Sequence, residues 1–336
     1  MKKGLLFVAM ASLVLATSCS SDDETVKVAS YKTPIALNPT FVKPDTRAVE
    51  TTTANLKEFQ TYSFVEGQDN YMNNVTYKLN GGSWSTEAGT FYWPVTGDLN
   101  FYCYAPATPG SEGQFTMNTS AQKLTGYVPY ATAATQQDFI YAKATGSLAA
   151  NATSGLDVIF KHALSEITVQ AKNTNKAYTV EVTGVKLGNV ISKGNFTFPS
   201  VSGTDAAWSL TTDKSDYTTE WTTAKTLEAN ASAMNDANVA FMLLPQQLAA
   251  ETKAIDGNYI ALKVKITMQG GKVLHDGWAY IAVATNWEMG KRYNYTVDFS
   301  AGAGQDDKGD DIISGKNVNL NVTVTPWVAS ANDIKA

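Results

Sequence analysis

Short segments in which apolar and polar residues alternate follow one another along the chain from about residue 56 onward. Turns rich in Gly, Asn and Pro separate them, and residues 75–79 end at Asn80-Gly81-Gly82, a combination typical of a β-hairpin. No amphipathic helix longer than about three turns is visible in the pattern. Strand-like segments that recur about every 8 to 12 residues, without helices between them, predict antiparallel β-sandwiches.

These segments form two series. The second series begins at residue 156 and includes residues 178–182 and 259–268, where the alternation is clear. A boundary near residue 155 leaves two parts that are each long enough to bury one sandwich core. The sequence therefore predicts an all-β chain with two domains. They are an N-terminal β-sandwich at residues 48–155 and a C-terminal β-sandwich at residues 156–336.

The most regular alternation in the chain lies close to its C-terminal end. Residues 317–325 follow an acidic, glycine-containing loop at residues 301–311 that would allow them to move. One face of this candidate strand is apolar and consists of Val318, Leu320, Val322 and Val324. The other face carries Asn and Thr side chains, as in a strand with one buried side.

The N-terminal residues have the pattern of an export signal. Lys2 and Lys3 precede an apolar run at residues 5–16, which is shorter than the roughly 20 residues that a membrane-spanning helix needs. The residues before Cys19 resemble the lipobox of bacterial lipoproteins, in which the Cys is acylated and becomes the first residue after cleavage. This resemblance implies a signal peptide at residues 1–18 and lipidation of Cys19. The alternative is an ordinary signal peptide with an incidental Cys.

Residues 19–47 are interpreted as a lipidated tether that contains a removable candidate strand. An acidic stretch at residues 20–24 resembles the surface-export signal of some Gram-negative lipoproteins, and a plain solvated tether is the alternative. Prolines interrupt the apolar residues that run from Val26 to Phe41. Because Pro lacks a backbone N–H, we expect this segment to lie at a sheet edge or to form an extended linker.

Composition and charge exclude several kinds of chemistry. A net charge of −5 disfavours a nucleic-acid surface, which needs clustered Lys and Arg. Two His and two Cys leave little material for a metal centre, a cofactor site or imidazole-dependent catalysis. The aspartates of residues 306–311 lack the bidentate Glu of calcium loops, so we expect a solvated loop and neither metal nor cofactor. No nucleophile, base and orienting residue stand out together, which predicts that the chain is not an enzyme.

Arginine is rare in this chain: Arg47 and Arg292 stand against 24 lysines. Arg47 lies in a polar, proline-containing segment that a protease could reach. Arg292 lies within an expected strand, where backbone pairing should protect it. An arginine-specific protease would therefore have one accessible target, and the alternative interpretation of Arg47 is an ordinary surface residue.

Several segments, taken in their order along the chain, resemble the fimbrillin family, the type V pilins of Gram-negative gut and oral bacteria. They include the lipobox, the lone Arg of residues 44–48 and the closing strand that runs up to Trp327. The other similar segments are residues 90–106, 160–167 and 287–295. The resemblance covers nearly the whole chain and depends on order and spacing more than on any single motif.

This resemblance implies two transthyretin-like β-sandwich domains in tandem and export as a lipoprotein to the outer membrane and cell surface. An arginine-specific protease would then cut after Arg47, remove one strand and expose an apolar groove. The C-terminal strand of a neighbouring subunit, here residues 317–325, would fill the groove. The implied partners are other pilin subunits, outer-membrane lipid before maturation, and a host or bacterial surface ligand. The alternative for residues 317–325 is a closing strand in the chain's own sheet.

Two functions besides that of a fimbrial subunit supporting adhesion stay open. A surface lipoprotein could bind glycans through a sandwich face without polymerising, with Trp84, Trp208 and Trp221 as stacking candidates. A β-sandwich glycosidase would need a carboxylate pair, and none stands out in the sequence.

Overall fold

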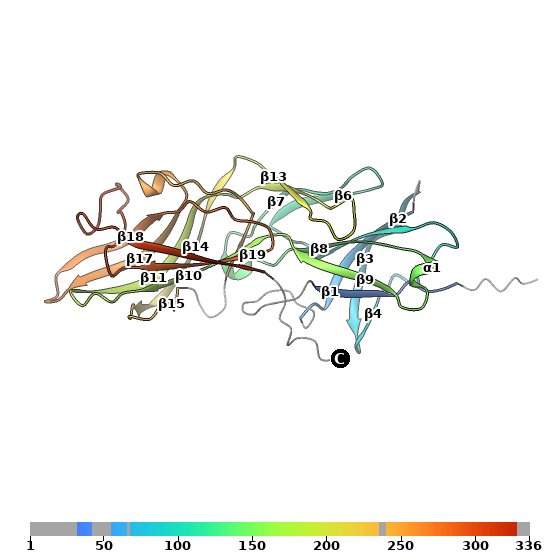
Figure 1. Ribbon diagram of the computed structural model, residues 1–336, viewed down its shortest axis with the longest axis horizontal. Coiled ribbons are helices and arrows are strands. Elements are labelled where there is room, and N and C mark those ends of the chain that lie inside the picture. The colour runs from blue at the N-terminus through green and yellow to red at the C-terminus, as the bar shows by residue number, and fades with distance from the viewer. Residues whose placement is uncertain (1–31, 42–54, 66–67, 235–239, 328–336) are drawn as a thin grey trace, which may run out of the picture. The chain divides into compact units, whose positions relative to one another are not determined.

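The computed structural model describes residues 32–41, 55–65, 68–234 and 240–327, and Thr33–Ala336 form one compact unit. Strands dominate the described part of this unit (Figure 1). The helices described there are short: η1 (Ala133–Thr135), α1 (Leu148–Asn151) and η2 (Ala254–Asp256). The prediction of an all-β chain is therefore confirmed, while the arrangement as two transthyretin-like domains stays a prediction.

Seven strands form the first sheet, in the order β1-β9-β8-β5-β2-β3-β4. Their bounds are Leu37–Phe41 (β1), Glu58–Val65 (β2), Gln68–Asn80 (β3), Ser83–Ser85 (β4), Leu99–Ala105 (β5), Ile140–Gly146 (β8) and Leu156–His162 (β9). Neighbouring strands run antiparallel, except that β1 runs parallel to β9. The turn between β3 and β4 is the expected hairpin, with Gly81 and Gly82 at φ of +57° and +89°.

A four-stranded sheet, ordered β13-β12-β7-β6, shares an aromatic core with the first sheet. Its strands are Glu112–Met117 (β6), Gln122–Val128 (β7), Gly194–Thr197 (β12) and Ala207–Leu210 (β13). Phe196 of β12 is fully buried, and its ring centroid lies 5.0 Å from that of Tyr141 in β8. Strands from both sides of residue 155 therefore meet in this sheet.

The pairing of β9 also differs from the expected grouping of strands. Sequence analysis placed residues 156–162 at the start of the C-terminal domain, whereas their hydrogen bonds join them to β8 and β1 of the first sheet. A period-two pattern identifies a strand but contains no information about its neighbour in the sheet. The pairing thus assigns this strand to the first sheet, and the division into two domains stays a prediction.

Two further sheets enclose the core that is built from the C-terminal part of the chain. One has the order β14-β11-β17-β18, and the other contains β15-β10-β19-β20, with β16 also paired to β10. The bounds are Ser165–Lys172 (β10), Tyr178–Ile191 (β11), Lys214–Thr226 (β14), Ser232–Ala233 (β15), Phe241–Leu243 (β16), Tyr259–Met268 (β17), Val273–Ala282 (β18), Lys291–Asp298 (β19) and Asn319–Pro326 (β20). Inward residues of both sheets, such as Val169, Val182 and Val264, join one buried cluster, as in a β-sandwich.

Cys103 lies in β5, a strand of the first sheet, and its side chain is completely buried. Burial raises the pKa of the thiol to about 12, although the nearby Thr61 hydroxyl works in the opposite direction. The thiol therefore behaves as a small apolar side chain, as its strand-like surroundings in the sequence indicate. In the described ranges, no helix is long and apolar enough to cross a membrane.

We expect the folded chain to protect Cys103 from soluble thiol reagents at pH 8. With a pKa of about 12, the thiolate fraction at that pH is about one in ten thousand. The measurement uses a Cys19→Ser variant, in which Cys103 is the only thiol, and follows labelling before and after unfolding. A second variant that also carries Ser85→Cys, at an exposed position, is the reactive control. Stoichiometric labelling of Cys103 in the folded chain would contradict the expectation.

Candidate functional site

The edge of the first sheet is formed by a strand that precedes Arg47 in the sequence. β1 pairs with β9 from Leu37↔Leu156 to Phe41↔Phe160. Alternate residues of this segment are buried against the sheet: Ile35, Leu37, Pro39 and Phe41. The side-chain amide of Asn38 between them donates to Ser154 O at 2.9 Å. The expectation of an edge strand, drawn from the prolines, is confirmed for residues 37–41.

β1 also supplies backbone pairing that β9 otherwise lacks among the described strands. The register of β9 with β8 consists of Ile140↔His162 and Tyr141↔Lys161, whereas residues 156–160 pair with β1. Burying Ile35, Leu37 and Phe41 contributes about 4–9 kcal/mol before ordering costs. Loss of β1 would therefore uncover an apolar groove and leave residues 156–160 as an unpaired edge.

The C-terminal strand lies at the edge of a different sheet. β20 pairs antiparallel with β19, and Val322 and Val324 lie opposite Tyr295 and Tyr293. Its apolar face is poorly covered: Val322 is 38% and Val324 is 48% exposed. Val318 and Leu320 are half-buried against the C-terminal core. The predicted strand is present over Asn319–Pro326 as a weakly packed edge strand of the chain's own sheet, and its donation to a second copy stays a prediction.

The end of β20 is anchored by one aromatic residue. Directly after Pro326, the Trp327 N–H donates to Gly290 O at 2.8 Å, and the indole is only 2% exposed. The indole stacks on the His162 ring, with a centroid distance of 4.3 Å and an interplanar angle of 7°. The ring of Phe41, at the end of β1, lies 6.0 Å from the same imidazole. His162 therefore contacts the ends of both edge strands.

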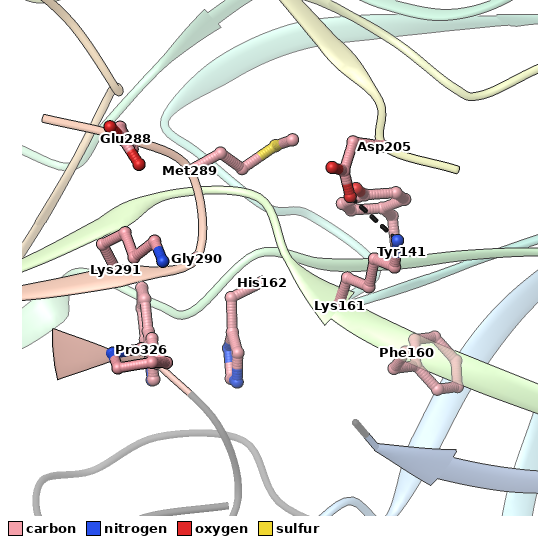
Figure 2. Close-up of a pocket in the computed structure, with 11 residues that line it drawn as sticks. Tyr141, Phe160, Lys161, His162, Asp205, Glu288, Met289, Gly290, Lys291 and Pro326 are labelled. Carbon is pink, nitrogen blue, oxygen red and sulfur yellow. Dashed lines mark hydrogen bonds and ion pairs between the residues drawn. The ribbon is translucent and has the colours of Figure 1, made fainter. Parts of the chain in front are cut away.

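A buried carboxylate holds the His162 imidazole in place. Its Nδ1 lies 2.9 Å from Asp138 Oδ2, and both side chains are almost completely buried. A cavity of about 510 Å³ opens beside the imidazole (Figure 2). Its lining includes Tyr141, Phe160, Lys161, Met289, Pro326 and Trp327. The arrangement lacks an activated nucleophile, and it is suited to docking an aromatic side chain rather than to catalysis.

Arg292 lies in a paired strand, as its position in the sequence predicts, and its protection from proteolysis stays a prediction. It lies in β19, which pairs with β10 on one side and with β20 on the other. Its Nε donates to Glu166 Oε2 at 2.7 Å, and the Glu166 side chain is 1% exposed. Burial raises the pKa of Glu166, and the nearby carboxylate of Asp138 adds to the rise. The guanidinium therefore compensates a carboxylate that is costly to bury.

Other sequence candidates have structural roles. The indole N–H groups of Trp208 and Trp221 donate to Ala163 O and Val182 O, so both rings are tied to the chain's own backbone. Asp306 Oδ1 accepts the backbone N–H groups of Lys308 and Asp310, contacts that lower its pKa and shape the acidic loop. Within the described residues, no group of three or more His, Cys, Asp or Glu side chains could hold a metal ion.

Two predicted site residues lie outside the described residues, namely Cys19 and Arg47. The structure places the four apolar residues of the candidate donor strand on or just before β20. Sequence analysis missed the contact of His162 with Trp327 and Phe41, because these residues are far apart in the chain. The one feature of the sequence that pointed to this contact is Trp327, which directly follows the closing strand.

The chain matches the model of the fimbrillin-like family over residues 46–327, and it belongs to this family. The protein is accordingly a structural one and not an enzyme. Family membership also indicates a fimbrial role at the cell surface, in assembly with other fimbrial subunits. No curated protein is a significant match to this chain.

Solved structures with low sequence identity share the fold. A fimbrial protein from Bacteroides vulgatus ATCC 8482 is 15% identical, with a TM-score of 0.58 over 88% of this chain and 99% of that one. A proposed cell adhesion protein from Bacteroides ovatus ATCC 8483 is 17% identical, with a TM-score of 0.50 over 89% and 99% of the two chains. Another, from Bacteroides eggerthii DSM 20697, is 14% identical, with a TM-score of 0.51 over 89% and 98%.

We expect Glu166→Ala to lower the free energy of unfolding by about 3–5 kcal/mol, because it removes the buried carboxylate that pairs with the Arg292 guanidinium, and the Arg292 side chain is only 12% exposed. Denaturant unfolding measures the change. The control is Glu87→Ala, since Glu87 is 85% exposed and pairs with Lys78 at 3.7 Å. Its effect should stay within about 0.5 kcal/mol. Equal effects of the two substitutions would show that the buried pair is not structurally important.

Proposed function

We propose that this chain is a subunit of a cell-surface fimbria that is assembled by strand exchange. It is exported as a lipoprotein through Cys19 and held at the outer membrane until it is cut after Arg47. The cut breaks the covalent link between β1 and the rest of the subunit, and β20 of a second copy then displaces β1 along β9. The observation that carries this proposal is the match between the inward face of β1 and the exposed apolar face of β20.

The two faces have the same number and spacing of apolar positions. In the N-terminal segment the buried residues are Ile35, Leu37, Pro39 and Phe41. In the C-terminal segment the apolar residues are Val318, Leu320, Val322 and Val324. Both sets repeat every second residue over seven positions, so one strand can replace the other without a change of register. Pairing along β9 would supply the backbone hydrogen bonds.

The proposed exchange is favoured because it would bury side chains of β20 that are partly exposed in the single chain. In the single chain, Val322 and Val324 remain 38% and 48% exposed while they pair with β19. In the groove that β1 leaves, these side chains would be buried, which is worth up to about 1.5–3 kcal/mol for each. After a cut at Arg47, β1 would keep its hydrogen bonds and its packing but lose its covalent link to the rest of the subunit. It could then be displaced by a strand that is part of another subunit.

The cut itself should be confined to one arginine. We expect an arginine-specific protease to cleave the precursor once, after Arg47, and the product to form ladders that resist SDS. Arg47→Lys should prevent both results. Arg292→Lys is the matched control, because it keeps a positive charge near Glu166 and should change neither. Cleavage at Arg292, or a clean cut at Arg47 that yields only monomers, would contradict the proposal.

The apolar face of β20 should be needed for assembly and dispensable for folding. Val322→Asp with Val324→Asp should change the stability of the precursor by less than about 1 kcal/mol, because both side chains are exposed there. The same variant, cut after Arg47, should form no ladders, since two carboxylates would enter an apolar groove.

The control carries Asn321→Asp with Thr323→Asp, which adds the same charge to the other face of the strand. It should assemble like the unchanged chain, as judged by SDS gels and electron microscopy. If both variants assemble equally well, the apolar face of β20 does not enter a groove.

A further inference from the structure

We propose that the face of the His162 ring on which Trp327 stacks, at the wall of the cavity, is a docking site for Trp327 of a second copy of this chain. This inference rests on the proposed strand exchange and names the contact that ends each exchanged strand. In the single chain, Trp327 occupies the site in its own subunit. In a fibre, each subunit's Trp327 would leave this position with β20, and the next subunit's Trp327 would stack on the same imidazole.

The first argument is that β20 and Trp327 cannot move separately. Trp327 follows Pro326, the last residue of the strand, with no intervening linker. Donation of β20 to another subunit therefore withdraws the indole from His162 and from Gly290 O. A buried aromatic site would be left without its occupant in every subunit that donates a strand, which is unfavourable unless another side chain fills it.

The second argument concerns the register along β9. β1 runs parallel to β9 with Phe41 opposite Phe160, so the position two residues further along lies opposite His162. If Val324 of a donated strand takes the place of Phe41, Pro326 comes to lie opposite His162. Trp327 is the next residue. Because the strand ends at Pro326, the side chain of Trp327 need not follow the alternating up-and-down order of the strand residues. The donated strand thus delivers an indole to the stacking position on His162 that the acceptor's own indole has left.

The third argument is that neither exchanged strand is needed to hold the imidazole. His162 pairs with Ile140 of β8, and its Nδ1 is fixed by the buried Asp138. The Gly290 carbonyl, which accepts the N–H of Trp327, belongs to the turn before β19. The acceptor site is therefore formed in advance and is complementary to an aromatic ring with a backbone donor.

The test uses two variants of the full chain, each with one introduced cysteine in a Cys19→Ser background. One carries Trp327→Cys and the other carries Met289→Cys, since Met289 lines the same cavity. The two are cut after Arg47, assembled as a mixture and treated with a short bis-maleimide crosslinker. We expect a crosslinked dimer that contains one chain of each kind. The buried Cys103 should not react.

A chain with both substitutions shows whether the crosslinker can span the two positions, because its uncut form should crosslink within one molecule. A mixture with Ser85→Cys in place of Met289→Cys, at a position in β4, should give no mixed dimer. Ladders without the mixed dimer would overturn this inference and leave strand exchange intact. Absence of ladders from the unchanged chain would instead overturn the proposed function.

A second pair covers the case in which Trp327→Cys fails to fold. Pro326→Cys keeps the indole and lies at an exposed position, and Lys161→Cys lies next to His162 on β9. The same mixed dimer is expected, because the proposed register places Pro326 of one copy beside Lys161 of the next. Assembled ladders that give no mixed dimer from this pair would show that Trp327 stays in its own subunit.

Discussion

The parallel pairing of β1 with β9 is the contact on which the edge of the first sheet depends. It supplies the backbone partner of residues 156–160, since β8 pairs with β9 only near His162 in the described strands. It also covers the adjacent core with four alternate side chains. An edge strand can be withdrawn without separating the remaining strands, but its withdrawal here creates an immediate need for a replacement. The β1–β9 contact thus stabilises the edge of the sheet while β1 is present, and its loss would leave a site that another strand could fill.

The C-terminal sheet shows the complementary arrangement. Its central strand β19 is fixed by pairing on both sides and by the buried contact between Arg292 and Glu166. Its edge strand β20 is held by backbone pairing with β19 and by Trp327, while its valines remain exposed. The two strands proposed to exchange are therefore at sheet edges, whereas Arg292 lies in a strand that is paired on both sides. His162 lies where the ends of the two edge strands meet.

Local patterns in the sequence predicted local structure well. Alternation gave most strands, and Asn80-Gly81-Gly82 gave a hairpin with the backbone angles that glycine favours. The prolines near Leu37 correctly indicated an edge strand. Sheet neighbours could not be read in the same way, because β9 resembles any other strand until its partners are known. The cluster of His162, Asp138 and Trp327 likewise joins residues whose proximity depends on the whole fold.

The separation of β1 from its partner has a kinetic consequence. Asn38 and Asp157, neighbours across the β1–β9 pair, are 119 residues apart in the chain, so β1 can dock only after β9 has found its sheet. During that interval an unoccupied groove could capture a strand from another molecule. While the chain is uncut, tethering gives β1 an effective concentration in the groove that can reach the millimolar range. Under the proposed function, cleavage would abolish this advantage, and the covalent link would delay polymerisation until the chain is cut.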